Sequence, residues 1–100
     1  MQLLDSASFN EAINNPLPVV IDFYADWCGP CKRLSPILEE LAVDNEGKAL
    51  FYKVNTDDEP ELAMQYEVSG IPNVVCFKNG EVYKRAIGLV PKDKLAEILV

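Results

Sequence analysis

Apolar residues recur along this chain at two spacings, and the two spacings predict different elements. Residues 18–25 (PVVIDFYA) and 49–55 (ALFYKVN) are β-branched and aromatic runs with apolar side chains on both faces, which is typical of buried strands. Between these runs, apolar residues recur at helical spacing and predict a helix over residues 30–45. They are Leu34, Ile37, Leu38, Leu41 and Ala42. Pro36 lies inside this stretch and is expected to kink the helix.

Three shorter helices are predicted from the way they begin. The motif SFNE at residues 8–11 fits a capping box and predicts a helix over residues 8–15. Acidic residues and a proline start a second helix over residues 59–66. Another proline opens a final helix over residues 91–99.

A hairpin is predicted near the end of the chain. Its two strands cover residues 73–78 and 81–87, and Asn79-Gly80 between them suits a tight turn with positive φ. A short first strand over residues 2–4 completes the set. Strand–helix–strand connections give parallel pairing, whereas the hairpin adds antiparallel strands. We therefore expect an α/β fold with a mixed central sheet and helices on both faces.

Length and composition restrict the classes of protein. A chain of 100 residues, 49% of them apolar, fits one domain over residues 1–100 with one sizeable core. The formal charge of −7 argues against a nucleic-acid binder, which needs a basic face. No apolar run is long enough to span a membrane, and the N-terminus does not resemble a signal peptide. We expect a cytoplasmic protein.

Cys28 and Cys31 are three residues apart, and three interpretations of such a pair can be compared. Structural zinc needs four ligands, but the only other cysteine is the distant Cys76 and the chain has no histidine. We therefore expect no metal site. A structural disulfide across so short a loop removes little entropy from the unfolded chain.

The third interpretation, a reactive pair, has a physical basis. Pro30 suits the first turn of a helix, which puts Cys28 directly before that helix, facing unpaired amide groups. These amides and the helix dipole stabilise a thiolate, so we expect an exposed Cys28 with a lowered pKa. Cys31 lies one turn further along, within disulfide reach. This arrangement favours dithiol–disulfide exchange.

Asp22 is an acid in an otherwise apolar run. Burial disfavours the charged form of a carboxyl group and so raises its pKa. A raised pKa suits proton transfer near neutral pH. The alternative is a purely structural acid at a strand edge.

At this point the sequence resembles the thioredoxin family. The motif WCGPCK at residues 27–32 matches the active-site motif of the family, and the match continues through segments that cover almost the whole chain. The resemblance implies the thioredoxin fold, with a five-stranded mixed sheet flanked by four helices.

The resemblance also implies roles for individual residues. Cys28 would be the nucleophile and Cys31 the resolving cysteine, cycling between dithiol and a Cys28–Cys31 disulfide. Asp22 would assist proton transfer to or from Cys31, and Lys53 would modulate Asp22. Gly29 and Pro30, with Lys53, would tune the redox properties of the pair.

An apolar substrate-binding surface is implied as well, with Pro72 as the cis-proline beside the disulfide. Its positions are Trp27, Gly29, Pro30, Ile71, Pro72, Gly88 and Leu89. Two residues depart from the usual pattern of the family. Tyr24 stands where many members have tryptophan, and Asn73 stands where threonine is usual, which bears on substrate contacts beside the groove. We interpret Cys76 as a buried apolar residue.

The function expected on these grounds is reduction of disulfides in other proteins by a monomer that binds neither membranes nor nucleic acids. The resemblance implies no bound cofactor, and recycling by a flavin-containing thioredoxin reductase that uses NADPH. An oxidase or isomerase is the alternative within enzymes. A binding subunit that clamps a partner is the alternative outside them.

Overall fold

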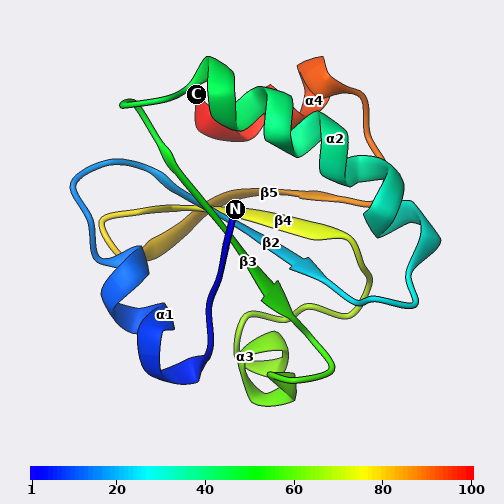
Figure 1. Ribbon diagram of the computed structural model, residues 1–100. Helices are drawn as coiled ribbons and strands as arrows, with labels where there is room; N and C mark the ends of the chain where they lie inside the picture. The colour runs from blue at the N-terminus through cyan, green and yellow to red at the C-terminus, as the bar shows by residue number, and fades with distance from the viewer.

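A five-stranded sheet in the order β1-β3-β2-β4-β5 forms the centre of the computed structural model, which describes residues 1–100 (Figure 1). The first three strands in this order are parallel, and β4 and β5 are antiparallel to their neighbours. The strands are β1 (Gln2–Leu3), β2 (Val19–Tyr24), β3 (Leu50–Asn55), β4 (Asn73–Lys78) and β5 (Glu81–Ile87). The predicted mixed sheet and its hairpin are confirmed, and Asn79 and Gly80 in the turn have φ of 57° and 78°.

Four helices cover the two faces of the sheet. Figure 1 shows α1 and α3 on one face and α2 and α4 on the other. The helices are α1 (Ser6–Ile13), α2 (Gly29–Asp44), α3 (Pro60–Gln65) and α4 (Lys92–Ala96), the last followed by a 3₁₀ turn (Glu97–Leu99). The expected final helix is therefore part α and part 3₁₀, and α2 continues through Pro36. The five-stranded sheet with four helices is confirmed.

Strand β2 separates two apolar cores because its side chains alternate between the faces. Ile21 and Phe23 pack with residues of α1 and α3. Val20 packs with residues of α2 and α4. Asp22 has the same alternation as Val20, so its carboxyl group lies on the α2 face.

The start of α1 corrects one prediction. The N-cap is Asp5, whose Oδ1 accepts the N–H of Ser8 at 2.9 Å, while the Ser8 hydroxyl accepts the N–H of Asp5 at 3.1 Å. Ser8 is thus the third helical residue, and Glu11 is not the capping partner. The expected box began three residues late because Asp5 and Ser8 are both good caps and the sequence does not rank them.

Strand β3 corrects a second prediction, which concerns its burial. We expected it to be buried, but only Val54 and Asn55 are, and the other four side chains are partly exposed. Only the two-residue β1 lies beyond it in the sheet. Apolar composition shows that a strand can be covered, but the length of the neighbouring strand decides how much of it is.

Candidate functional site

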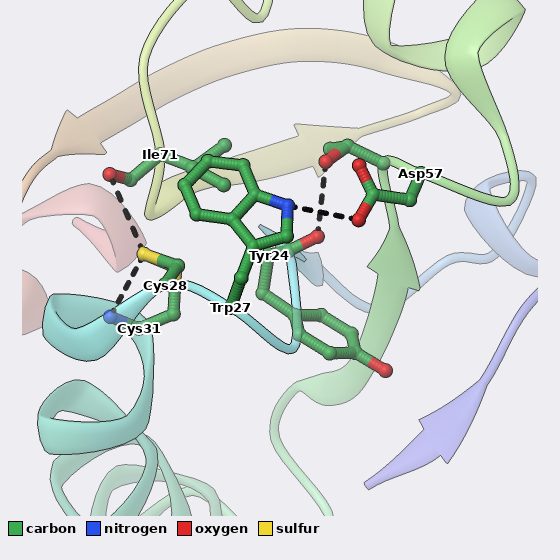
Figure 2. Close-up of a disulfide and its surroundings, with 7 residues drawn as sticks. Tyr24, Trp27, Cys28, Cys31, Asp57 and Ile71 are labelled. Carbon is green, nitrogen blue, oxygen red and sulfur yellow. Dashed lines mark hydrogen bonds between the residues drawn. A yellow bond between two sulfur atoms is a disulfide. The ribbon is translucent and has the colours of Figure 1, made fainter.

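The cysteine pair lies at the start of α2. Cys28 is the N-cap of this helix and Gly29-Pro30 forms its first turn, as the sequence predicts. The two sulfur atoms are bonded in a Cys28–Cys31 disulfide, with a Cα–Cα distance of 5.3 Å. The Cys31 N–H donates to Cys28 Sγ at 3.2 Å (Figure 2). An amide of the first turn of α2 therefore faces the sulfur of Cys28, and a negative charge on this sulfur would be stabilised there.

Cys28 is less exposed than the sequence led us to expect. Both cysteines are 4% exposed and pack with Ala25, while Tyr24 and Ile71 lie against the same small cluster. The prediction of an exposed Cys28 is therefore wrong for the disulfide form. The sequence places Cys28 before a helix, but the loop that covers it comes from a distant part of the chain.

That covering loop contains the expected cis-proline. The Ile71–Pro72 peptide bond is cis, and Pro72 is buried. The carbonyl oxygen of Ile71 lies 3.9 Å from Cys28 Sγ (Figure 2). The Pro72 carbonyl accepts the N–H of Gly88 at 2.8 Å, and Gly88 has φ of +88°, a conformation that favours glycine. This bond brings the end of β5 beside the cysteine pair.

The predicted substrate-binding residues differ in exposure. Trp27 is 71% exposed and Leu89 is 44% exposed, which is unusual for large apolar side chains unless they meet a partner. Ile71 and Gly88 are partly exposed. These residues come from three separate segments, and the fold places each segment near the disulfide.

Trp27 has one polar partner that the sequence analysis missed. Its indole Nε1–H donates to Asp57 Oδ2 at 2.9 Å (Figure 2). The sequence predicts only that acidic residues start a helix in this region. Thirty residues separate the two partners, so no local signal pairs them.

Asp22 is buried in the wall of a cavity of about 140 Å³. The carboxyl group is 4% exposed, and its Oδ1 has no hydrogen-bond partner. Cys31 lines the same cavity, so the structure brings the predicted proton carrier and the resolving cysteine together. Loss of water contact raises the pKa of Asp22 to about 7, and the positive charge of Lys53 partly opposes this rise. The predicted direction of the shift is confirmed.

Lys53 is the neighbour of Asp22 across the sheet. The two residues are paired in the parallel register of β2 and β3, and both line the cavity. The Lys53 ammonium lies 5.5 Å from the centre of the Tyr24 ring, within reach of a cation–π contact. Tyr24, one of the two departures from the family pattern, thus touches the group that tempers the pKa of Asp22.

The two remaining residues singled out in the sequence are both buried. The Asn73 side chain is 1% exposed and neither of its polar atoms has a hydrogen-bond partner, so it lies in the interior of the protein. Cys76 is fully buried with Val20 and Leu34, which confirms it as a core residue, and burial raises the pKa of its thiol.

Two further findings concern metal ions and membranes. No three His, Cys, Asp or Glu side chains are grouped closely enough to hold a metal ion. None of the helices has the length and apolar character needed to cross a membrane.

Known thioredoxins resemble this chain over nearly its whole length. The sequence model of a family described as Thioredoxin matches residues 1–100. The thioredoxin of Pyropia yezoensis is 45% identical over 98 residues, which cover 98% of this chain and 92% of the relative. A thioredoxin of Staphylococcus aureus (strain Mu50 / ATCC 700699) is 45% identical over 93 residues, covering 93% of this chain and 88% of the relative. The chloroplastic M-type thioredoxin of Spinacia oleracea is 44% identical over 98 residues, covering 97% of this chain but 54% of the relative.

Proposed function

The chain belongs to the thioredoxin family and is a protein dithiol–disulfide oxidoreductase, and we propose that Cys28 is its nucleophile and Cys31 its resolving cysteine. The observation that carries this assignment is the position of Cys28 as the N-cap of α2. Free amides and the positive end of the helix dipole stabilise a thiolate there. The thiolate is the attacking species in disulfide exchange, so Cys28 attacks first.

The proposed reaction has two steps. The Cys28 thiolate attacks one sulfur of the target disulfide; a mixed disulfide forms and the other target sulfur leaves as a thiolate. The Cys31 thiol then loses its proton and attacks Cys28 Sγ, which releases the second target sulfur. Two electrons pass to the target, and the protein is left as the Cys28–Cys31 disulfide.

We propose that the proton of Cys31 goes to Asp22. The shared cavity supports this role, and a pKa of about 7 lets the carboxyl group accept and return a proton near neutral pH. Lys53 keeps the pKa of Asp22 from rising further. Gly29 and Pro30 shape the first turn of α2 and so adjust the thiolate of Cys28.

Target proteins are proposed to dock across Trp27, Ile71, Pro72, Gly88 and Leu89. The exposed side chains of Trp27 and Leu89 supply apolar contact area, and the chain next to Pro72 offers backbone groups to an extended segment. Asn73 contributes no side-chain contact because it is buried.

Thioredoxins need no bound cofactor for this exchange, and their partners are disulfide-containing substrates and a reductase. We propose that the reductase is a flavin-containing enzyme that takes electrons from NADPH. We also propose that the protein is a cytoplasmic monomer with one domain over residues 1–100. The names of some relatives place those proteins in the chloroplast, so cell fractionation is the test of location.

The direct test follows NADPH consumption with a thioredoxin reductase and a disulfide-bonded protein substrate. We expect turnover with the wild type, none with Cys28→Ser, and a trapped mixed disulfide with Cys31→Ser that is visible by mass spectrometry. Cys76→Ala is the matched control and should retain turnover, because Cys76 is buried in the core. A mixed disulfide trapped by Cys28→Ser instead would reverse the two roles.

Two alternatives are separated by the same variants. An oxidase or isomerase would form or reshuffle disulfides in a reduced substrate faster than it reduces them. A subunit that only clamps a partner would support its complex even after both cysteines are changed to serine.

A further inference from the structure

We propose that Asn55 is a positioning residue for Trp27, an inference that rests on the proposed docking role of this tryptophan. Asn55 is the last residue of β3 and is 7% exposed. Its side-chain hydrogen bonds do not reach the cysteine pair. Its contacts instead lead, in two steps, to the exposed indole ring beside Cys28.

The first step is a turn closed by the Asn55 side chain. Its Oδ1 accepts the N–H of Asp57 at 2.9 Å, the spacing of an Asx turn. Its Nδ2 donates to Asp26 Oδ2 at 3.5 Å. One buried amide therefore holds the residue directly before Trp27 and the residue that bonds to Trp27.

The second step is the bond from Trp27 Nε1–H to Asp57 Oδ2 (Figure 2). This bond lies at the surface, where water competes for both groups, so its net contribution is small unless the carboxylate is held in place. Trp27 is 71% exposed and has few packing contacts of its own. Its orientation therefore depends on the position of Asp57, and Asn55 holds the backbone from which the Asp57 side chain extends.

The surrounding backbone supports the same arrangement. The N–H and the hydroxyl of Thr56 both donate to the Tyr24 carbonyl, at 2.8 and 3.1 Å. Three pairs of residues thus join segments 24–27 and 55–57. They are Tyr24 with Thr56, Asp26 with Asn55, and Trp27 with Asp57. The Asn55 amide supplies the buried side-chain bonds among them, and removing it frees Asp26 and Asp57 together.

An ordered Trp27 lowers the entropy lost when a target protein docks, because immobilising a side chain opposes binding. We therefore expect Asn55→Ala to raise KM for a protein disulfide by about threefold to tenfold. The value of kcat should stay within about twofold, because the sulfur chemistry is unchanged. A small aromatic disulfide that does not reach Trp27 should be reduced at the wild-type rate.

The experiment also uses Trp27 as a reporter, since it is the single tryptophan of the chain. NMR measures how fast its indole N–H exchanges with water, in the oxidised protein and without any substrate. We expect Asn55→Ala and Asp57→Ala each to speed this exchange by about tenfold, with no further effect in the double variant. Asn55→Ser should restore slow exchange, because a serine hydroxyl can also accept the N–H two residues later.

Asn45→Ala is the matched control. Asn45 donates a comparable side-chain bond to the Leu41 carbonyl at the far end of α2, so its loss should change neither KM nor indole exchange. Unchanged indole exchange in Asn55→Ala overturns the inference, as does an equal loss of rate with the small disulfide. If Asn55→Ala does not fold, Asn55→Leu, which keeps the side-chain size but removes both bonds, takes its place, and unchanged indole exchange in that variant overturns the inference. A wild type without reductase activity would refute the proposed function, whereas the exchange measurements would still test the positioning of Trp27.

Discussion

At the scale of single residues, burial distinguishes Asp22 from the other acidic side chains. The chain has 16 acidic residues, and Asp22 is the one that is buried, with an unpartnered oxygen, and lines a cavity. Loss of hydration raises its pKa to about 7, and Lys53 limits the rise. The value is matched to proton exchange near neutral pH, although the same carboxyl group at the surface would be ionised.

Asp22→Asn tests this role. Above about pH 7 the wild-type carboxylate can take the proton of Cys31, so the rate of the second step should rise with pH as Asp22 ionises. The variant should lose this rise and react about tenfold more slowly at pH 8, a modest effect for a positioned base. Single-turnover reduction of a protein disulfide between about pH 5 and pH 9 measures both quantities.

The control is Glu39→Gln, which changes a half-exposed acid that lines the same cavity. It should keep the wild-type pH profile. An Asp22→Asn variant with an unchanged pH–rate profile would rule out proton transfer by Asp22.

At the scale of elements, the N-terminal caps of α1 and α2 differ in chemistry. Helix α1 is capped by Asp5 and Ser8, two polar residues that bond each other reciprocally. Helix α2 is capped by the sulfur of Cys28, a weak acceptor compared with an oxygen. The cap of α1 therefore serves stability, whereas the cap of α2 leaves its amides available to a thiolate.

Asp5→Ala should lower the free energy of unfolding, because the N–H of Ser8 loses its acceptor. Urea unfolding measures the change. Glu11→Gln is the comparison, since the sequence motif alone would make Glu11 the capping partner and the structure does not. Equal destabilisation by both variants would contradict the observed cap.

At the scale of the whole molecule, the two cores share one sheet, and Asp22 is buried within it. Its folded-state pKa is above the ordinary value of 3.8, so the folded protein holds a proton that the unfolded chain gives up. Stability from this group is complete below about pH 4 and is lost as pH rises through about 7. The protein therefore keeps a reactive carboxyl group at the expense of stability at neutral pH.

We expect Asp22→Asn to be more stable than the wild type at pH 8, by about 2–4 kcal/mol, given roughly 1.4 kcal/mol per pKa unit and some hydration through the cavity. The difference should shrink steadily towards pH 4. Urea unfolding of both proteins across this range measures it. A difference that does not depend on pH would mean that the pKa of Asp22 is the same in the folded protein as in the unfolded chain.

Much of this fold follows from local pattern. The strands, the hairpin at Asn79-Gly80 and the helix that begins after Cys28 depend on neighbours within a few residues, and all are confirmed. The order of these elements already indicated a mixed sheet with helices on both faces, and the resemblance to the thioredoxin family added the cis-proline, which spacing alone does not contain.

The predictions that were wrong or missing concern competition between two possible helix caps and contacts between residues far apart in the sequence. Asp5 and Ser8 compete as caps three residues apart, and the outcome depends on where the chain enters α1. Burial of Cys28 and Asn73, and the partial exposure of β3, depend on what other segments lie against them. The bond from Trp27 to Asp57 joins residues 30 positions apart, so neither flanking sequence indicates it.

By itself, the sequence determined the element types, the cysteine spacing and the position of Cys28 before a helix, because these depend on short-range geometry. Only the tertiary structure decided which side chains are buried and which residues from distant segments come into contact. It closed the Ile71–Pro72 loop over Cys28, placed Asp22 and Cys31 on one cavity, and aligned Asn55 and Asp57 behind Trp27. Hydration and proximity are set by packing between distant segments, which a motif of a few residues does not contain.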